Sequence, residues 1–205
     1  MNLFEVEVVT ASIGKVKQFR VELCYIQSIT DFIEKWHYSK NVNGLTIDYC
    51  FKLIDIEGNI IGAIIYGKIG MADVWRKYAE KESDLVELKR LCCIDNTPKN
   101  TESYFIGKTI RWLQKNTSIK KVISYADTTY NHSGTIYKAS NFIHVGMTNE
   151  GRVIMFEGKR YHDKTIRTMY KGKLKPFALK IKNAIQNGTA KYEDTGAKHI
   201  YLYEL

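Results

Sequence analysis

A buried strand that ends among polar side chains is the sequence feature that most constrains how this chain folds. Residues 122–126 (VISYA) are largely apolar and are followed at once by Asp127. A polar turn containing His132 then leads to a short helical segment with Tyr137 and to an apolar return strand. In open α/β sheets, binding and reaction sites form beyond the carboxyl ends of strands. The polarity of this corner therefore indicates a reaction site rather than a purely structural crossover.

The order of the expected strands and helices indicates an α/β (α+β) protein. Alternating apolar residues predict strands, and apolar residues three or four positions apart predict helices. A run of antiparallel strands is followed by strand–helix–strand–helix–strand, which favours a central twisted mixed sheet, parallel in its middle and flanked by helices. Strands are expected at residues 4–9, 15–24, 46–54, 60–66, 85–94, 121–126, 142–147, 153–157 and 200–203, helices at 26–36, 101–114, 134–139 and 177–185, and a short helix or ordered loop at 71–81.

The length of the chain fits one domain. Its 205 residues are enough for a full core, so residues 1–205 are expected to form a single domain, with a basic C-terminal extension at 159–205. No window approaches the roughly 18 apolar residues of a membrane span, and the charged N-terminal residues lack the apolar core of a secretory leader. We therefore expect a soluble, cytoplasmic protein with no membrane partner. The sequence leaves the oligomeric state open.

Positive charge is concentrated toward the C-terminus. The chain has 31 Lys and Arg against 22 Asp and Glu, a net charge of +9, and nine of the basic residues lie between positions 159 and 182. Such an excess favours a polyanionic partner, although a solvated face is the alternative interpretation. The candidate contacts to a phosphate backbone are Lys171, Lys173 and Lys175.

A His-Tyr pair closes the helix expected at residues 26–36. His37 and Tyr38 offer a titratable base and a phenol donor side by side, and a helix C-terminus favours the charged imidazolium. The alternative is that both residues form an amphipathic cap over the core.

The loop before the helix at 101–114 is a candidate anion site. Asn100 or Thr101 can cap this helix, and Ser103 lies in its first turn. Free N–H groups at a helix N-terminus suit a phosphate or pyrophosphate. Ordinary helix capping is the alternative interpretation.

The corner after residue 126 holds the third set of candidate side chains. Asp127 can orient an imidazole or accept a proton, and Tyr137 can donate one to a leaving group. The alternatives are a capping Asp and a core Tyr, or a two-His-one-carboxylate metal site of His37, His132 and Asp127. No HxxxH or HxH spacing occurs, so no metal ligands are assigned. The chain also lacks G-x-S-x-G, a P-loop and GxGxxG, which argues against serine hydrolases and nucleotide-binding enzymes.

The segment IYKASNFIHVG, residues 136–146, resembles the LYEKxGFxxxG segment of the GNAT N-acetyltransferases. In that family the Tyr often protonates the leaving thiolate, which implies this role for Tyr137. The resemblance also implies that residues 91–114 bind the pyrophosphate of an acyl-CoA donor such as acetyl-CoA. In place of the family's Q/R-x-x-G-x-G/A loop, this chain has NTPKNTESYFIG. The implied cofactor contacts are Asn100, Thr101, Ser103 and Gly107.

Four blocks in order resemble the Mom proteins of bacteriophage, a divergent branch related to the same acyltransferase fold. They are WHYSK, ELKRLCCIDNTPKNTESYFIG, SYADTTYNHSGTIYKASNF and KHIY, beginning at residues 36, 87, 124 and 198. The resemblance runs from about residue 25 to the C-terminus. The last block is similar to KHRY in that family, with Ile200 in place of Arg, and it implies that Lys198 and His199 contact phosphate or DNA.

Mom proteins place a carbamoylmethyl group on the exocyclic N6 of adenine in phage DNA and so shield it from host restriction. The resemblance implies the same activity here, on double-stranded DNA, with the adenine flipped out of the duplex. It implies catalytic roles for His37, Tyr38, Ser103, Asp127 and Tyr137. In our chemical hypothesis Asp127 or His37 accepts the N6 proton, Tyr137 donates to the leaving group, and Ser103 holds donor or acceptor at the helix mouth. A metal such as iron stays open as a cofactor.

Two other functions fit the same residues. The first is a conventional acyltransferase that acts on a small amine or a protein lysine. The second is a DNA-binding module that keeps the fold without catalysis, which predicts salt-sensitive DNA binding and no chemical product.

Overall fold

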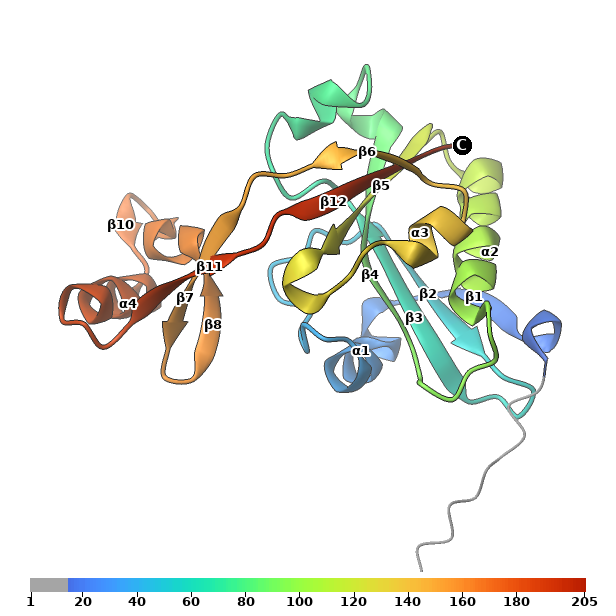
Figure 1. The fold of residues 1–205 in the computed structure, drawn as a ribbon, viewed down its shortest axis with the longest axis horizontal. Helices are drawn as coiled ribbons and strands as arrows, with labels where there is room; N and C mark the ends of the chain where they lie inside the picture. Colours follow the sequence, from blue (N-terminus) through green and yellow to red (C-terminus); the bar gives the residue numbers. More distant parts are fainter. Residues whose placement is uncertain (1–14) are drawn as a thin grey trace, which may run out of the picture. The chain divides into compact units, whose positions relative to one another are not determined.

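The computed structural model describes residues 15–205 and divides into two compact units (Figure 1). Among the described residues, the first unit contains residues 15–125 together with Thr135–His144 and Tyr201–Leu205. The second unit contains Ala126–Gly134 and Val145–Ile200. The strand expected at residues 4–9 lies outside the described residues. The expected single domain with an extension at 159–205 stays a prediction, and the boundary between the compact units falls elsewhere.

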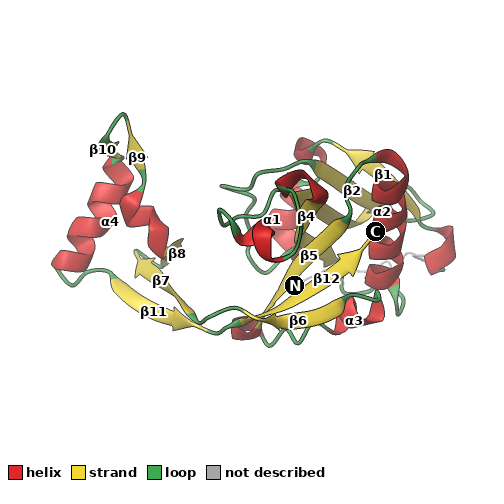
Figure 2. Cartoon of the chain, turned by 90° about the horizontal axis from the view of Figure 1, so that it is seen from above, coloured by secondary structure: helices red, strands yellow, loops and turns green. Residues whose placement is uncertain are grey.

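A seven-stranded mixed sheet forms the framework, in the order β1-β2-β3-β4-β5-β12-β6 (Figure 2). The pairs β1–β2, β2–β3 and β3–β4 are antiparallel, whereas β4–β5 is parallel, which confirms the expected mixed sheet. Strands β5, β6 and β12 carry the chain between the two units. The strands are β1 (Arg20–Cys24), β2 (Tyr49–Ile54), β3 (Ile60–Gly67), β4 (Leu85–Cys93), β5 (Lys121–Asp127), β6 (Ile143–Met147) and β12 (Lys198–Glu204).

Three helices belong to the first unit: α1 (Thr30–Trp36), α2 (Thr101–Asn116) and α3 (Thr135–Ala139). The apolar stripe expected on α2 is buried, and it consists of Phe105, Ile106, Ile110 and Leu113. One polar contact lies within this core, because the Tyr66 hydroxyl and Thr109 Oγ1 are 2.7 Å apart. Each group satisfies the other, which avoids the cost of an unpaired buried hydroxyl.

The second unit is built on a small antiparallel sheet in the order β11-β7-β8, together with a short hairpin and a helix. Its core contains Ile154, Phe156, Ile181, Ala184 and Ala190. The chain enters and leaves this sheet next to one hydrogen-bonded pair of residues, Thr148 and Lys198. The Thr148 N–H donates to Lys198 O, and the Lys198 N–H donates to Thr148 Oγ1, both at 2.9 Å. The elements are β7 (Gly151–Phe156), β8 (Lys159–His162), β9 (Met169–Tyr170), β10 (Lys173–Leu174), α4 (Pro176–Gln186) and β11 (Lys191–Thr195).

Several sequence-based boundaries were wrong. The strand expected at 15–24 begins only at Arg20, after a 3-10 turn at Val16–Gln18, and the helix expected at 26–36 is a 3-10 turn followed by α1. Strands β8, β10 and β11 were missed because charged residues interrupt their apolar alternation, and β9 was missed because it has only two residues. Among residues 15–205, no helix is long and apolar enough to cross a membrane.

Candidate active site

The sheet opens where strands β4 and β5 stop pairing. Their parallel ladder runs from Leu85 with Lys121 to Leu88 with Ser124, although β4 continues to Cys93. The Leu88 carbonyl then accepts a hydrogen bond from the Ser124 hydroxyl at 3.0 Å. On its other edge β4 carries a bulge at Lys89, because Ile65 pairs with Arg90 and Tyr66 with Leu88. Bulges beside active sites re-aim side chains, so this is the place in the first unit where polar groups can enter the sheet.

A nearly buried ion pair lies at this bulge. Lys89 Nζ is 2.9 Å from Glu87 Oε2, and the two side chains are 5% and 17% exposed. The Gly70 N–H donates to the same carboxylate oxygen at 3.1 Å. Burial lowers the pKa of the neighbouring Arg90, while the charges of Tyr38 and Glu87 oppose that shift. Glu87, Lys89 and Arg90 were not among the predicted site residues, although three charged residues in the otherwise apolar strand LVELKRLCC were a signal.

Tyr137 is held as a protonated phenol. Its hydroxyl is hydrogen-bonded to the side chain of Ser124. Burial raises the pKa of Tyr137 to about 12, and the nearby Tyr38 and Glu87 act in the same direction. At neutral pH the hydroxyl therefore keeps its proton and can donate it.

A second phenol near Glu87 has no acceptor. The buried Tyr125 hydroxyl has no hydrogen-bond partner among residues 15–205. Burial raises the pKa of Tyr125, and the charge of Glu87 adds to that shift. A buried donor without an acceptor requires an explanation, and a bound substrate or water would satisfy it. Tyr125 was not among the predicted site residues either, because a Tyr within an apolar strand is ordinarily a core residue.

His37 and Tyr38 lie at the end of α1 as expected. Their ring centroids are 4.3 Å apart. The Ser39 N–H donates to His37 Nδ1 at 3.1 Å, and Ser39 Oγ lies 2.8 Å from the same nitrogen. Because a backbone N–H can only donate, Nδ1 is an acceptor, and a neutral His37 carries its proton on Nε2. In this tautomer the ring presents a donor rather than a base at Nε2.

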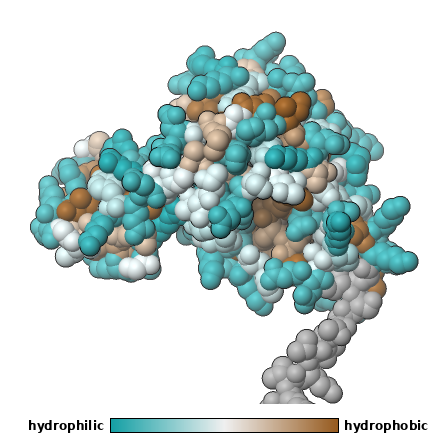
Figure 3. Space-filling model, viewed as in Figure 1, coloured by the Kyte–Doolittle hydropathy of each residue, from teal (hydrophilic) through white to brown (hydrophobic). Residues whose placement is uncertain are grey.

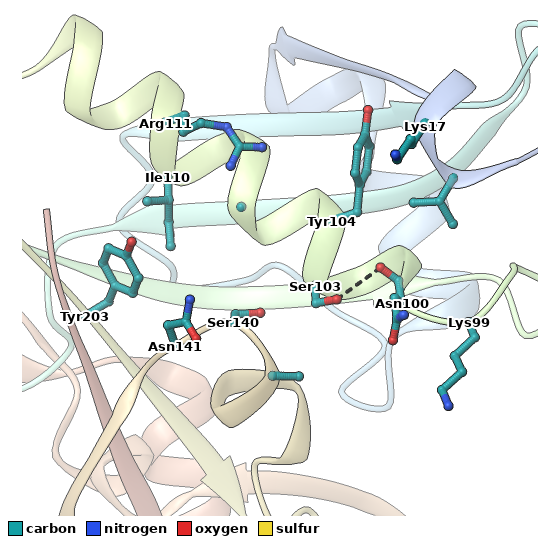
Figure 4. Close-up of a pocket in the computed structure, with 13 residues that line it drawn as sticks. Lys17, Lys99, Asn100, Ser103, Tyr104, Ile110, Arg111, Ser140, Asn141 and Tyr203 are labelled. Carbon is teal, nitrogen blue, oxygen red and sulfur yellow. Dashed lines mark hydrogen bonds between the residues drawn. The ribbon is translucent and has the colours of Figure 1, made fainter.

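A cavity of about 480 Å³ lies against the first turns of α2 (Figure 4). Three predicted cofactor contacts line it, namely Asn100, Ser103 and Gly107, and the Ser103 hydroxyl donates to Asn100 O at 3.1 Å. Thr101 does not line it, because its side chain is buried and donates to Pro98 O at 2.6 Å. The cavity is basic, with Lys17, Lys99 and Arg111 among its lining residues. This lining suits an anionic group.

Arg111 lies next to Gly107 on this face of α2. A Cβ placed on Gly107 would come within 3.6 Å of Arg111 Nη1. Arg111 and Gly107 both line the cavity, on the helix face that also carries Ser103. Neither Asn100 nor Thr101 caps α2 through a side chain, and Asn100 instead has a left-handed φ of 70°. The capping expected from the sequence was wrong in this respect.

In the second unit Asp127 is paired with a lysine. Its Oδ2 is 3.0 Å from Lys198 Nζ, and its Oδ1 accepts from the Thr129 N–H at 3.0 Å. Burial acts to raise the pKa of Asp127, but the hydrogen bonds from Lys198 and Thr129 outweigh it, and the pKa lies below its usual value. Asp127 is therefore ionised at neutral pH and is also a capping residue. Lys198, which was expected to contact DNA, neutralises this carboxylate.

The other predicted residues lie apart from these groups in the chain. The His132 N–H donates to Asp127 O at 3.2 Å, and its ring lies 6.2 Å from that of Tyr130. Lys171 and Lys173 belong to the β9–β10 hairpin, Lys175 precedes α4, and His199 lies in β12. Within residues 15–205 there is no group of three or more His, Cys, Asp or Glu placed to hold a metal ion.

The fold is that of the GNAT acetyltransferases. A variant of the spermidine N-acetyltransferase SpeG from Vibrio cholerae aligns with a TM-score of 0.53 and 8% identity, over 92% of this chain and 94% of its own. A candidate phosphinothricin N-acetyltransferase aligns with a TM-score of 0.52 and 12% identity, over 91% of this chain and 98% of its own.

Within this class of fold, the chain belongs to the Mom protein family, whose model matches residues 18–205. A curated relative, the methylcarbamoylase Mom of Escherichia phage Mu, is 28% identical over 162 residues. That alignment covers 76% of this chain and 65% of the relative, so the chain spans somewhat less than two thirds of the relative's length.

Proposed function

We propose that this protein is a transferase that modifies adenine in DNA, adding a carbamoylmethyl-type group to N6 and protecting phage DNA from host restriction. Its membership of the Mom family and the methylcarbamoylase from phage Mu support the type of transfer. The acetyltransferase fold supports an acyl-type donor.

The positive charge of the second unit is the observation that best supports DNA as the acceptor. This unit contains 12 Lys and Arg against six Asp and Glu, a net charge of +6, so it holds most of the chain's +9. A basic surface concentrated on one compact unit is the electrostatic signature of nucleic-acid binding. A transferase that acts on a small neutral amine would not require such a basic surface.

The protonation states of the side chains support the roles that we propose for them. Tyr137 donates a proton to the leaving group, since its raised pKa keeps the hydroxyl protonated. Asp127 is an ionised acceptor for the N6 proton, which becomes acidic only as the amino group attacks. His37, with Nε2 protonated, donates a hydrogen bond to a developing negative charge more readily than it removes a proton.

The adenine is proposed to leave the duplex before transfer. Its N6 is hydrogen-bonded to thymine within the stack, and enzymes that act on such atoms extrude the base. Tyr38 and Trp36 are both more than a third exposed and offer aromatic faces for a displaced base.

A nucleoside measurement tests the proposed reaction. The protein is produced in bacteria that support the reaction, plasmid DNA is digested, and the nucleosides are analysed by mass spectrometry. We expect a deoxyadenosine with added mass, and we expect Asp127→Ala to abolish it. Asp194→Ala is the matched control, because Asp194 is an exposed acid on β11 of the same unit. Unmodified deoxyadenosine from folded protein would contradict the function, and normal product from Asp127→Ala would contradict the role of that residue.

The proposed donor is a CoA-type molecule that carries the carbamoylmethyl group, so that the bond from N6 to its methylene carbon forms as the bond from that carbon to the leaving sulfur breaks. Its phosphates are proposed to lie in the basic cavity along α2. We expect acetyl-CoA to raise the melting temperature, and Arg111→Ala to weaken its binding about tenfold or more, because a charge-assisted hydrogen bond is lost. Lys115→Ala, one turn further along α2 and outside the cavity lining, should bind as wild type does. Titration calorimetry gives both dissociation constants. Equal binding by the two variants would place the donor elsewhere, and acetyl-CoA binding without DNA affinity would favour a conventional acyltransferase.

A further inference from the structure

The β9–β10 hairpin, residues 169–174, presents apolar side chains to solvent in a basic setting. Met169 and Tyr170 are 57% and 64% exposed. Lys171 and Lys173 follow directly, and Lys171 Nζ lies 5.5 Å from the centroid of the Tyr170 ring. Hydrophilic residues cover most of the second unit in the view of Figure 3, with few apolar residues among them.

The backbone holds this hairpin in a defined shape. Tyr170 pairs with Lys173 and Met169 with Leu174, which leaves Lys171 and Gly172 as a two-residue turn. Both turn residues have positive φ, 49° and 75°, as a type I′ turn requires. The hairpin is closed at its base, since the Lys175 N–H donates to Thr168 O at 2.9 Å. The exposed side chains are therefore carried on an ordered turn between a 3-10 segment, Asp163–Arg167, and α4.

We propose that this hairpin is a wedge that enters stacked DNA bases, an inference that rests on the proposed DNA substrate. Apolar side chains inserted between base steps unstack them, and neighbouring Lys side chains bind the flanking phosphates. Tyr170 supplies the face that stacks on a base, Met169 fills the adjacent step, and Lys171, Lys173 and Lys175 bind the backbone. The unit's charge of +6 makes a polyanion the fitting partner for this surface.

Insertion of this hairpin would open the duplex for the reaction. Removing an adenine from the stack requires breaking its stacking and pairing, and an inserted aromatic ring offsets that loss. Base insertion and phosphate binding depend on different side chains of this hairpin. Substituting the inserted ring should therefore change base unstacking, and substituting the lysines should change the salt dependence of binding.

Fluorescence of 2-aminopurine tests the wedge directly, because this base brightens when it is unstacked. A duplex with one 2-aminopurine is titrated to saturation with each variant. We expect wild type to raise the fluorescence and Tyr170→Ala to reduce that rise about fivefold or more, given the contribution of one stacked base. Tyr25→Ala, which removes a still more exposed ring from the first unit (84% against 64% for Tyr170), should behave as wild type. Thermal melting confirms that each variant is folded.

Salt dependence tests the phosphate contacts of the same hairpin. Replacing Lys171, Lys173 and Lys175 together by Ala should reduce the slope of log K against log salt by up to about 2.7, since each phosphate contact contributes about 0.9. At saturation this variant should still brighten the probe. Tyr170→Ala should leave the slope unchanged.

Three results would overturn the wedge: a full fluorescence rise with Tyr170→Ala, an equal loss with Tyr25→Ala, or hairpin substitutions that weaken binding to phosphatidylserine vesicles while DNA binding stays intact. The fluorescence assay involves no transfer reaction. An unmodified nucleoside profile with an intact fluorescence pattern would therefore contradict the proposed function alone. DNA with the target adenine opposite an abasic position should restore product formation by Tyr170→Ala.

Discussion

Replacing Tyr137 with Phe is expected to lower the rate of DNA modification by about 10²- to 10⁴-fold, the range for loss of a general acid. The substitution removes only the hydroxyl, whose pKa of about 12 keeps it protonated throughout the neutral range. Single-turnover formation of the modified nucleoside, with DNA and donor saturating, measures this effect. In wild type, ionisation of Tyr137 should cause no loss of activity until the pH approaches its pKa of about 12.

The control for this variant is Tyr66→Phe. This substitution also removes a hydrogen-bonded hydroxyl, in this case one bonded to Thr109. Tyr66→Phe and Tyr137→Phe should therefore each be destabilised by about 1 kcal/mol. Ser124 keeps its bond to Leu88 O in Tyr137→Phe, so the sheet opening should persist. Equal activity of the two variants would mean that Tyr137 is a packing residue and that another group protonates the leaving group.

The second large effect is expected for Lys89→Met, which should lower the free energy of unfolding by about 3 kcal/mol or more. Removing one partner of a buried ion pair leaves the other charge uncompensated. Glu87 would keep the Gly70 N–H at 3.1 Å but lose the ammonium at 2.9 Å. Urea denaturation measures the change, and adding Glu87→Gln to Lys89→Met should restore much of the stability.

An exposed ion pair provides the comparison. Arg76 and Asp73 are joined at 2.9 Å, but their side chains are 66% and 70% exposed. Arg76→Met should therefore cost about 1 kcal/mol or less. A Lys89→Met variant as stable as Arg76→Met would show that water reaches Glu87 and that the pair is not a structural element of the bulge.

Local sequence patterns predicted the framework better than the site. The buried stripe of α2 and the strand at 60–66 follow from spacing that short segments display by themselves. The opening between β4 and β5 depends on register between strands and on a bulge at Lys89, which no local pattern records. For the same reason Glu87 and Lys89 resembled the polar face of a surface strand, although the fold buries both.

Contacts between distant positions account for the remaining differences. Asp127 was recognised as a strand-end acid, but its partner Lys198 lies 71 positions away and was assigned to DNA. In the small sheet of the second unit, β7 was predicted, but β8 and β11 were missed because only one face of the sheet packs on a core, with Lys, Arg and Glu on the exposed positions. The family resemblance, by contrast, was found from sequence blocks and is confirmed over residues 18–205.

The hydrogen-bonded pair of Thr148 and Lys198 has an evolutionary consequence. The segment between these two residues includes β7, β11 and the basic hairpin. It leaves and rejoins the seven-stranded sheet beside this hydrogen-bonded pair. An excursion closed in this way can lengthen, shorten or be exchanged without shifting the register of β4 and β5, which hold Glu87 and Ser124, because extra loop length costs little free energy. Selection can therefore alter the target preferences of such a protein independently of its transfer chemistry.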